Sequence, residues 1–168
     1  FNGTESDGAA LNATSKEGEN TASVVAIDEA GNESAAVAIS WTYDTKAPVE
    51  VAITGTPSNG AKTNNAAVKL AASATDDVTV AEKITYRWTF NGTESDGAAL
   101  NATSKEGVNT ASVVAIDEAG NESAAVAISW TYDTKAPVEV AITRTPSNGT
   151  KTNKAEVKLA ASATDDVT

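Results

Sequence analysis

Acidic side chains in the loops of this chain have the type and spacing of ligands for a hard divalent cation. One acidic residue precedes a proline-containing segment, and acidic pairs follow runs of alternating apolar residues, so we expect several carboxylates to converge. Carboxylates held close together repel one another, and Ca²⁺ relieves this repulsion by accepting six to eight oxygen ligands. The candidate metal ligands are Asp44, Asp76, Asp77, Asp117, Glu118, Asp133, Asp165 and Asp166.

The same acidic loops have a simpler interpretation as solvated surface that keeps the protein soluble. No stretch of the sequence has the spacing of an EF-hand loop. Lys46 and Lys83 are the cations expected near the first group of carboxylates. The sequence therefore leaves calcium binding and a solvated acidic surface as open alternatives.

Catalysis is not expected from these carboxylates. A glycosidase needs two carboxylates at a defined separation across a cleft, whereas Asp76 and Asp77 are adjacent and would point to opposite faces of a strand. The chain contains no His and no Cys, which excludes nucleophilic triads that need these residues and thiolate metal sites. We therefore expect that the protein is not an enzyme.

Three further patterns have a structural and a functional interpretation. Trp88 and Trp130 have the parity of inward-facing strand residues, which favours a place in the core over a sugar-stacking surface. Lys69 is a candidate for an isopeptide cross-link to an Asn, but no spacing supports one. Several Asn residues begin Asn-x-Ser/Thr triplets and are interpreted as turn residues. They are Asn2, Asn12, Asn32, Asn91, Asn101, Asn121 and Asn148.

Short strands must position these residues, because apolar side chains recur with a period of two. The clearest case is 84–90, in which Ile84, Tyr86 and Trp88 alternate with polar residues. The other predicted strands are 49–54, 68–74, 98–102, 105–108, 111–116 and 124–132. Seven short strands separated by turn signals predict an all-β fold, a sandwich of two antiparallel sheets.

The chain contains nearly the same sequence twice. Residues 1–79 align with residues 90–168 at an offset of 89 and differ from them at five positions. A period of this length indicates a tandem array of folded units, and Pro48 marks a boundary because it restricts the residue before it to extended conformations. We predict three parts: 1–43 as the later part of one repeat, 44–135 as a complete repeat with its linker, and 136–168 as the first part of the next.

The segment Val80–Thr89 occurs only once, whereas most of the period occurs twice. Each flanking part then lacks half of a core, and we expect it to be disordered by itself. We further expect VAEKITYRWT and another FNGTESDG to follow Thr168, so that identical repeats join end to end. Thr168 of one copy and Phe1 of the next would then lie within about 33–36 Å, the reach of ten extended residues.

Three motifs of the period resemble those of bacterial immunoglobulin-like tandem repeats in large surface adhesins. They are DTKAP at 44–48, TDDV at 75–78 and AIDEAGN at 115–121. The resemblance covers the whole period and implies tandem seven-stranded immunoglobulin-like β-sandwich repeats of 89-residue period. It also implies calcium at the junctions between repeats, in agreement with the acidic residues.

The function that the resemblance implies is that of a structural extender. Such repeats belong to a secreted bacterial surface adhesin or extracellular fibre and project a distal region, outside this chain, that binds a host-cell or matrix ligand. The alternative is a multivalent module in which the repeats themselves bind a glycan or protein. A net charge of −11 and a pI of about 4.3 argue against a nucleic-acid partner, and no apolar run is long enough to span a membrane.

Overall fold

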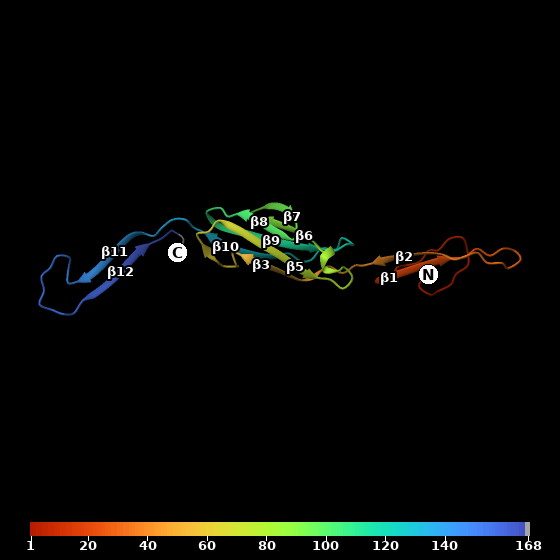
Figure 1. Ribbon diagram of the computed structural model, residues 1–168, viewed down its shortest axis with the longest axis horizontal. Coiled ribbons are helices and arrows are strands. Elements are labelled where there is room, and N and C mark those ends of the chain that lie inside the picture. The colour runs from red at the N-terminus through yellow and green to blue at the C-terminus, as the bar shows by residue number, and fades with distance from the viewer. Residues whose placement is uncertain (167–168) are drawn as a thin grey trace.

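The computed structural model of the protein describes residues 1–166 and is elongated, with a two-sheet unit between two strand pairs (Figure 1). At one end β1 (Gly18–Val24) pairs with β2 (Val37–Tyr43), and at the other β11 (Val138–Thr145) pairs with β12 (Lys158–Thr164). The fold is all-β, and the one helical element in the described part is the 3₁₀ turn η1 (Ala81–Lys83). No helix within residues 1–166 has the length and apolar character needed to cross a membrane.

Two sheets form the central unit, which is a sandwich-like arrangement. One sheet has the strand order β3–β5–β8 and the other β4–β10–β9–β6–β7. Neighbouring strands are antiparallel except for β4, which runs parallel to β10. The strands are β3 (Val49–Thr56), β4 (Lys62–Thr63), β5 (Ala67–Thr75), β6 (Thr85–Phe90), β7 (Thr93–Asp96), β8 (Ala99–Thr103), β9 (Gly107–Ile116) and β10 (Val126–Tyr132).

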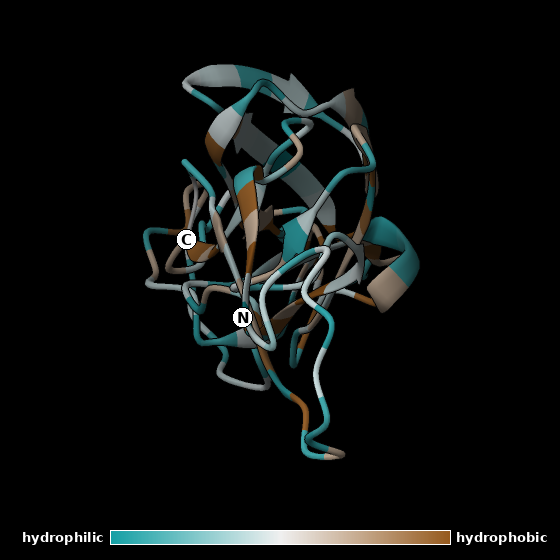
Figure 2. Cartoon of the chain, turned by 90° about the vertical axis from the view of Figure 1, so that its left-hand side faces the viewer, coloured by the Kyte–Doolittle hydropathy of each residue, from teal (hydrophilic) through white to brown (hydrophobic). Residues whose placement is uncertain are grey.

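The core lies between the two sheets and contains the inward-facing residue of each alternating pair. Trp88 and Trp130 from the five-stranded sheet are 0% and 2% exposed, and they belong to the same cluster as Leu70 and Leu100 from the other sheet. Seen along the long axis, hydrophobic and hydrophilic segments alternate along the strands (Figure 2). The prediction that both tryptophans are core residues is confirmed, and full burial of such a side chain stabilises the fold by roughly 1.5–3 kcal/mol.

The strand pattern differs from the sequence-based prediction in three places. The predicted strands 105–108 and 111–116 are one continuous strand, β9. Two strands were not predicted: β4 has only two residues, and β7 is the polar sequence TESD. Eight strands therefore lie between Val49 and Tyr132, where seven were expected. Both additional strands lie at sheet edges. They form because each pairs with one neighbouring strand, and neither shows an alternation of apolar and polar residues.

The flanking strand pairs repeat the registers of the central unit at the 89-residue offset. Val24 pairs with Val37 as Val113 pairs with Val126, and β11–β12 has the same register shift as β3–β5. These parts are thus partly ordered, whereas disorder was expected, because an antiparallel pair satisfies the backbone hydrogen bonds along one edge of each strand. The expected distance between Thr168 and Phe1 involves a residue outside the described ones.

Gly55 in β3 lies opposite Leu70 in β5, and its backbone has a φ of 117°. A Cβ atom added there would lie 2.1 Å from the backbone carbonyl oxygen of Lys69. Only glycine adopts this conformation readily, so we expect Gly55→Ala to destabilise the central unit by about 1–3 kcal/mol. Arg144 occupies the same place one period later, and Arg144→Ala is the matched control. Equal midpoints for both variants in urea unfolding would contradict this assignment.

Candidate functional site

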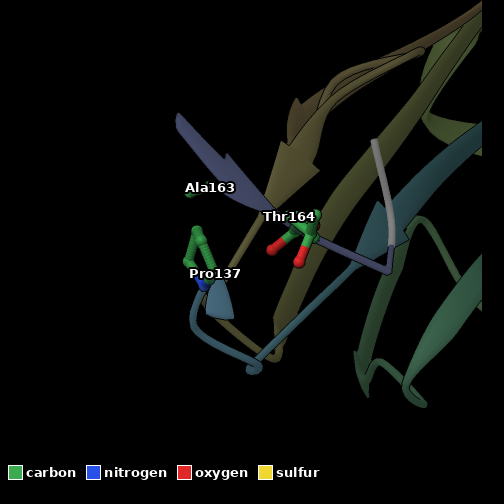
Figure 3. Close-up of a pocket in the computed structure, with 4 residues that line it drawn as sticks. Pro137, Ala163 and Thr164 are labelled. Atoms are coloured by element: carbon green, nitrogen blue, oxygen red, sulfur yellow. The ribbon is translucent and has the colours of Figure 1, made fainter. Parts of the chain in front are cut away.

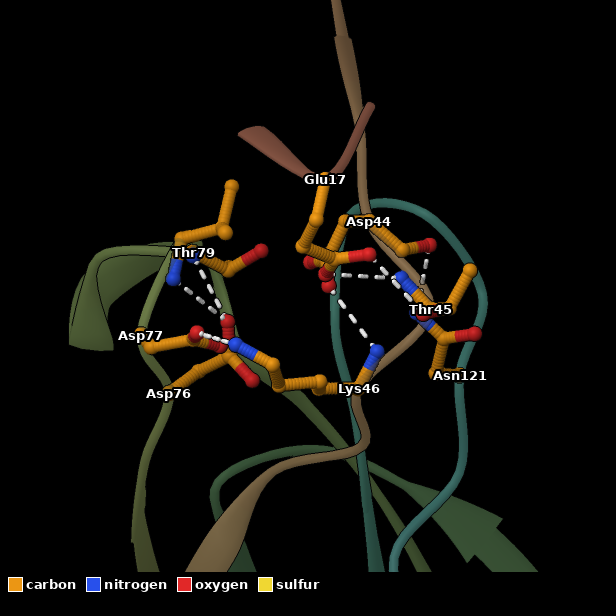
Figure 4. Close-up of polar contacts among 9 residues, drawn as sticks. Glu17, Asp44, Thr45, Lys46, Asp76, Asp77, Thr79 and Asn121 are labelled. Carbon is orange, nitrogen blue, oxygen red and sulfur yellow. Dashed lines mark hydrogen bonds and ion pairs between the residues drawn. The ribbon is translucent and has the colours of Figure 1, made fainter. Parts of the chain in front are cut away.

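Three acidic residues from separate segments meet at the end of the central unit that faces β1 and β2. Asp44 follows β2 directly, in the linker to β3. Asp76 follows β5, and Asp117 follows β9. Strands β5 and β9 lie in different sheets, so the sandwich brings their ends together beside the linker (Figures 1 and 4). We call Asp44, Asp76 and Asp117 the junction cluster.

The carboxylates of the junction cluster are close and largely buried. One oxygen from each residue lies within 4.8 Å of the other two. Asp44 is 8% exposed and Asp117 is 5% exposed. This spacing matches a group of oxygen ligands around one cation.

Backbone groups hold each carboxylate in place. The Asp44 Oδ1 accepts a hydrogen bond from the Lys46 N–H at 3.0 Å. The Asp76 Oδ1 accepts from the Val78 and Thr79 N–H groups at 3.0 and 2.8 Å. These bonds are short-range Asx-type turns, and each of them uses only one oxygen of the carboxylate.

The second oxygens of two cluster residues have no partner in the protein. The Oδ2 atoms of Asp44 and Asp76 are buried and accept no hydrogen bond. A buried oxygen without a partner loses its hydration and gains nothing in return. A bound cation would supply the missing interaction, so these two atoms are the strongest indication that the cluster holds a metal ion.

The side chain of Asn121 joins the linker to the loop after β9. Its amide donates to Asp117 Oδ2 at 2.8 Å and to the backbone oxygen of Asp44 at 3.1 Å. Its backbone N–H donates to Asp117 Oδ1 at 2.8 Å. Asn121 therefore orients one cluster carboxylate and fixes the linker beside it.

The pKa values of Asp44 and Asp117 are shifted in opposite directions. Burial raises the pKa of Asp44 above its ordinary value, and the nearby charges of Asp76, Asp117 and Glu17 add to this effect. Burial also acts to raise the pKa of Asp117, but hydrogen bonds from Asn121 outweigh it and hold that pKa below its ordinary value. The ionised state of Asp44 is thus disfavoured without a cation.

Two predicted ligands are not part of the junction cluster. Asp77 points to Lys46 and forms an ion pair with it (Figure 4), and Glu118 pairs with Lys83 at 3.1 Å. The two lysines expected near the site are therefore present, but each neutralises a carboxylate outside the cluster. Neither lysine forms its ion pair with a residue of the junction cluster.

Glu17 connects the preceding strand pair to the linker and was missed by sequence reasoning. Its carboxylate accepts hydrogen bonds from the Thr45 hydroxyl at 2.9 Å and from the Thr45 N–H at 3.2 Å. The same pair recurs as Glu106 and Thr134 one period later. The linker is thus held from both sides, by Glu17 and by Asn121.

A second acidic group occurs one period later. Asp133, Asp165 and Asp166 also offer oxygens within 4.8 Å of one another. This group is more exposed and includes Asp166, whose pKa is lowered by its hydrogen bond with Lys135. A shallow hollow lies beside it, lined by Pro137, Ala163, Thr164 and Asp165 (Figure 3). All eight predicted metal ligands are thus near one of the two groups, and six belong to them.

The other sequence candidates show no site of their own. Lys69 lies opposite Asn101 in the β5–β8 register, and both side chains are exposed. Asn121 acts as a turn and linker residue, as interpreted from its triplet.

Comparisons with known proteins give no further assignment. No protein-family model matches the chain, and no curated protein matches it.

Substitution of Asn121 tests how the linker is held. We expect Asn121→Ala to lower the free energy of unfolding of the central unit by about 1–3 kcal/mol, because it leaves buried oxygens of Asp117 and Asp44 without donors. Asn32 is the matched control, since it makes the same local bonds to Asp28 in an exposed loop. Urea unfolding followed by circular dichroism measures the difference. Equal losses for Asn121→Ala and Asn32→Ala would contradict a role for Asn121 in the linker.

Proposed function

We propose that this chain is a stretch of immunoglobulin-like structural repeats from a secreted bacterial surface adhesin or extracellular fibre. The repeats extend a distal binding region away from the surface, and Ca²⁺ at the junction cluster stiffens the linker between them. The observation that carries the proposal is the pair of buried, unpartnered oxygens on Asp44 and Asp76, at the linker between two sheet-containing parts. A cation at this position would tie the linker residue to two loops of the next unit.

The donor set favours calcium. All three cluster side chains are carboxylates, and hard cations such as Ca²⁺ and Mg²⁺ prefer oxygen ligands. Ca²⁺ accepts irregular sets of six to eight oxygens, whereas Mg²⁺ requires a small, nearly octahedral site. Asp44, Asp76 and Asp117 would hold the ion, which would supply positive charge and remove their mutual repulsion.

The strand connections support the immunoglobulin-like assignment. In the central unit the first strand pairs with β5, and the chain then crosses to β4, which pairs with β10 in the other sheet. Apart from the parallel pair β4–β10, neighbouring strands are antiparallel, and the two sheets share one core. This is the arrangement of immunoglobulin-like sandwiches. The repeated registers of the flanking strand pairs support a series of such units.

Small-angle X-ray scattering on longer arrays tests the extender function. Each added 89-residue unit should lengthen the particle by a constant amount of at least about 26–34 Å in millimolar Ca²⁺, given strands of eight to ten residues along the axis. In chelator the increment should shrink because the linkers bend. A length that does not grow in proportion to the repeat number in Ca²⁺ would contradict the proposal.

A binding screen separates the extender from a repeat that binds ligands itself. The chain is expected to show no saturable binding on glycan and extracellular-matrix arrays at micromolar concentration. Saturable binding that strengthens with repeat number would instead assign the function to the repeats, through avidity.

A further inference from the structure

The first and the last segments of the central unit are joined directly to each other. The chain enters the unit through β3 and, after a turn, forms β4, which pairs with β10, the last strand before the next linker. The two linkers leave the unit at opposite ends, one towards β2 and the other towards β11 (Figure 1). Tension along the chain therefore enters the unit at β3 and β4 and leaves it at β10.

The pairing between β4 and β10 is parallel and continues beyond the two residues of β4. Three backbone hydrogen bonds connect the two segments at the end of β10 that adjoins the next linker. They run from the Gly60 N–H to the Ser129 oxygen (2.7 Å), from the Thr131 N–H to the Ala61 oxygen (2.8 Å) and from the Asp133 N–H to the Thr63 oxygen (3.0 Å). The first and last segments of the unit are thus held together by more than the short strand β4.

The side chain of Asn59 adds a fourth hydrogen bond to this series. Its Oδ1 accepts from the Ser129 N–H at 2.9 Å. Acceptors at positions 59, 61 and 63 therefore face donors at positions 129, 131 and 133, which is the even spacing of a parallel ladder. We call residues 59–63 and 129–133, with these four hydrogen bonds, the terminal-strand clamp.

The direction of the strands determines how tension acts on the terminal-strand clamp. Because β4 and β10 are parallel, pulling on the two linkers moves the strands in opposite directions along their own length. All four hydrogen bonds are then strained together. In an antiparallel pair both linkers would leave from the same end, and the hydrogen bonds would break one after another.

We propose that the terminal-strand clamp makes each repeat resist unfolding under tension. This function is separate from stiffening by a cation, because the junction cluster lies at the end of the unit that faces β2 and the clamp lies at the end that faces β11. The inference rests on the proposed function in one respect, since tension reaches both linkers only in a tandem array. An extender that holds a ligand at its distal end is pulled in this way whenever the ligand moves relative to the surface.

Single-molecule force spectroscopy with two pairs of attachment points tests the effect of direction. The chain has no Cys, so handles can be attached at Ser40→Cys and Thr143→Cys, which load the central unit through both linkers. A second pair, Lys105→Cys and Thr143→Cys, pulls β9 and β10 apart from their common end. All three replaced residues are exposed. The unfolding force should be at least about twice as high for the first pair, because parallel strands are then strained along the whole ladder.

The variant Asn59→Ala tests the clamp itself. It removes one of the four hydrogen bonds and should lower the unfolding force for the first pair by about a quarter. Its urea midpoint should change little, because Asn59 is exposed and water replaces the lost bond. Asn65→Ala is the matched control, since the Asn65 Oδ1 also accepts a backbone N–H, that of Ala67 at 3.0 Å, outside the clamp. It should keep the unfolding force of the unchanged protein.

Two results would overturn the proposal: equal unfolding forces for the two pairs of attachment points, or equal forces for Asn59→Ala and Asn65→Ala. The first comparison changes no residue of the clamp, so it decides the question even if Asn59→Ala folds poorly. Both differences should persist in chelator, because the clamp and the junction cluster lie at opposite ends of the unit. The scattering experiment tests the extender function separately, so a clamp that fails these tests leaves that function standing.

Discussion

Addition of Ca²⁺ to the protein after treatment with a chelator is expected to raise the melting temperature of the central unit by roughly 10–20 °C. For a site with a dissociation constant of about 10⁻⁴ M, about 10 mM Ca²⁺ is a hundredfold excess and stabilises the folded state by about 2.7 kcal/mol. One kcal/mol shifts the melting temperature of a domain of this size by about 4–8 °C. Differential scanning calorimetry measures the shift, and a melting curve that Ca²⁺ leaves unchanged would contradict a metal site.

The substitution Asp44→Asn should change the melting temperature differently in Ca²⁺ and in chelator. In Ca²⁺ the variant should melt well below the unchanged protein, because it lacks a charged ligand. In chelator it should melt at the same temperature or higher, because it removes a buried charge that faces Asp76 and Asp117. The matched control is Asp77→Asn, which changes a neighbouring carboxylate outside the cluster and should keep the response to Ca²⁺.

The pH dependence follows from the raised pKa of Asp44. The folded, metal-free protein holds this proton more tightly than the unfolded chain does. The contribution of Asp44 to stability is therefore present at low pH and is lost as the pH rises through its folded-state pKa. Asp44→Asn in chelator should flatten this part of the curve, and an unchanged slope would contradict the assignment.

The substitution Trp130→Ala is expected to cost about 3–5 kcal/mol of unfolding free energy. Its side chain is 2% exposed, and its indole N–H donates to Ser104 Oγ at 2.9 Å. Trp41 is the matched control, because it has the same neighbours in sequence and the equivalent bond to Ser15, but is 36% exposed. Trp41→Ala should leave the urea midpoint of the central unit nearly unchanged. Similar losses of unfolding free energy for Trp130→Ala and Trp41→Ala would contradict the difference in packing between the central unit and the β1–β2 pair.

Much of the fold could be predicted because the alternation of apolar and polar residues indicates which side chains are buried. Ile84, Tyr86 and Trp88 alternate with polar residues, and all three are buried. The two strands that were missed, β4 and β7, lack this pattern. They exist because a neighbour offers free backbone groups, and the same residues at 4–7 form no strand where that neighbour is missing. Strands of this kind are determined by tertiary context.

The candidate site was predictable to the level of strand ends but not of individual side chains. The convergence of Asp44, Asp76 and Asp117 follows from which strand ends meet at one pole of a sandwich. The pairing of Asp77 with Lys46 depends on side-chain direction, which adjacent sequence positions do not reveal. Asn121 had a local signal, since it follows Asp117 by four residues in a turn. Glu17 had none, because it comes from the preceding unit.

The most direct test of the account is the distance distribution across the linker, measured by pulsed electron paramagnetic resonance. The chain has no Cys, so spin labels at Ser40→Cys in β2 and Ser73→Cys in β5 report on this linker alone. Both positions are exposed and lie outside the cluster. We expect a narrow distance distribution in Ca²⁺ and a broad one in chelator, and a broad distribution in both for Asp44→Asn. Distributions of equal width in Ca²⁺ and in chelator would contradict the claim that a cation at the junction cluster stiffens the linker.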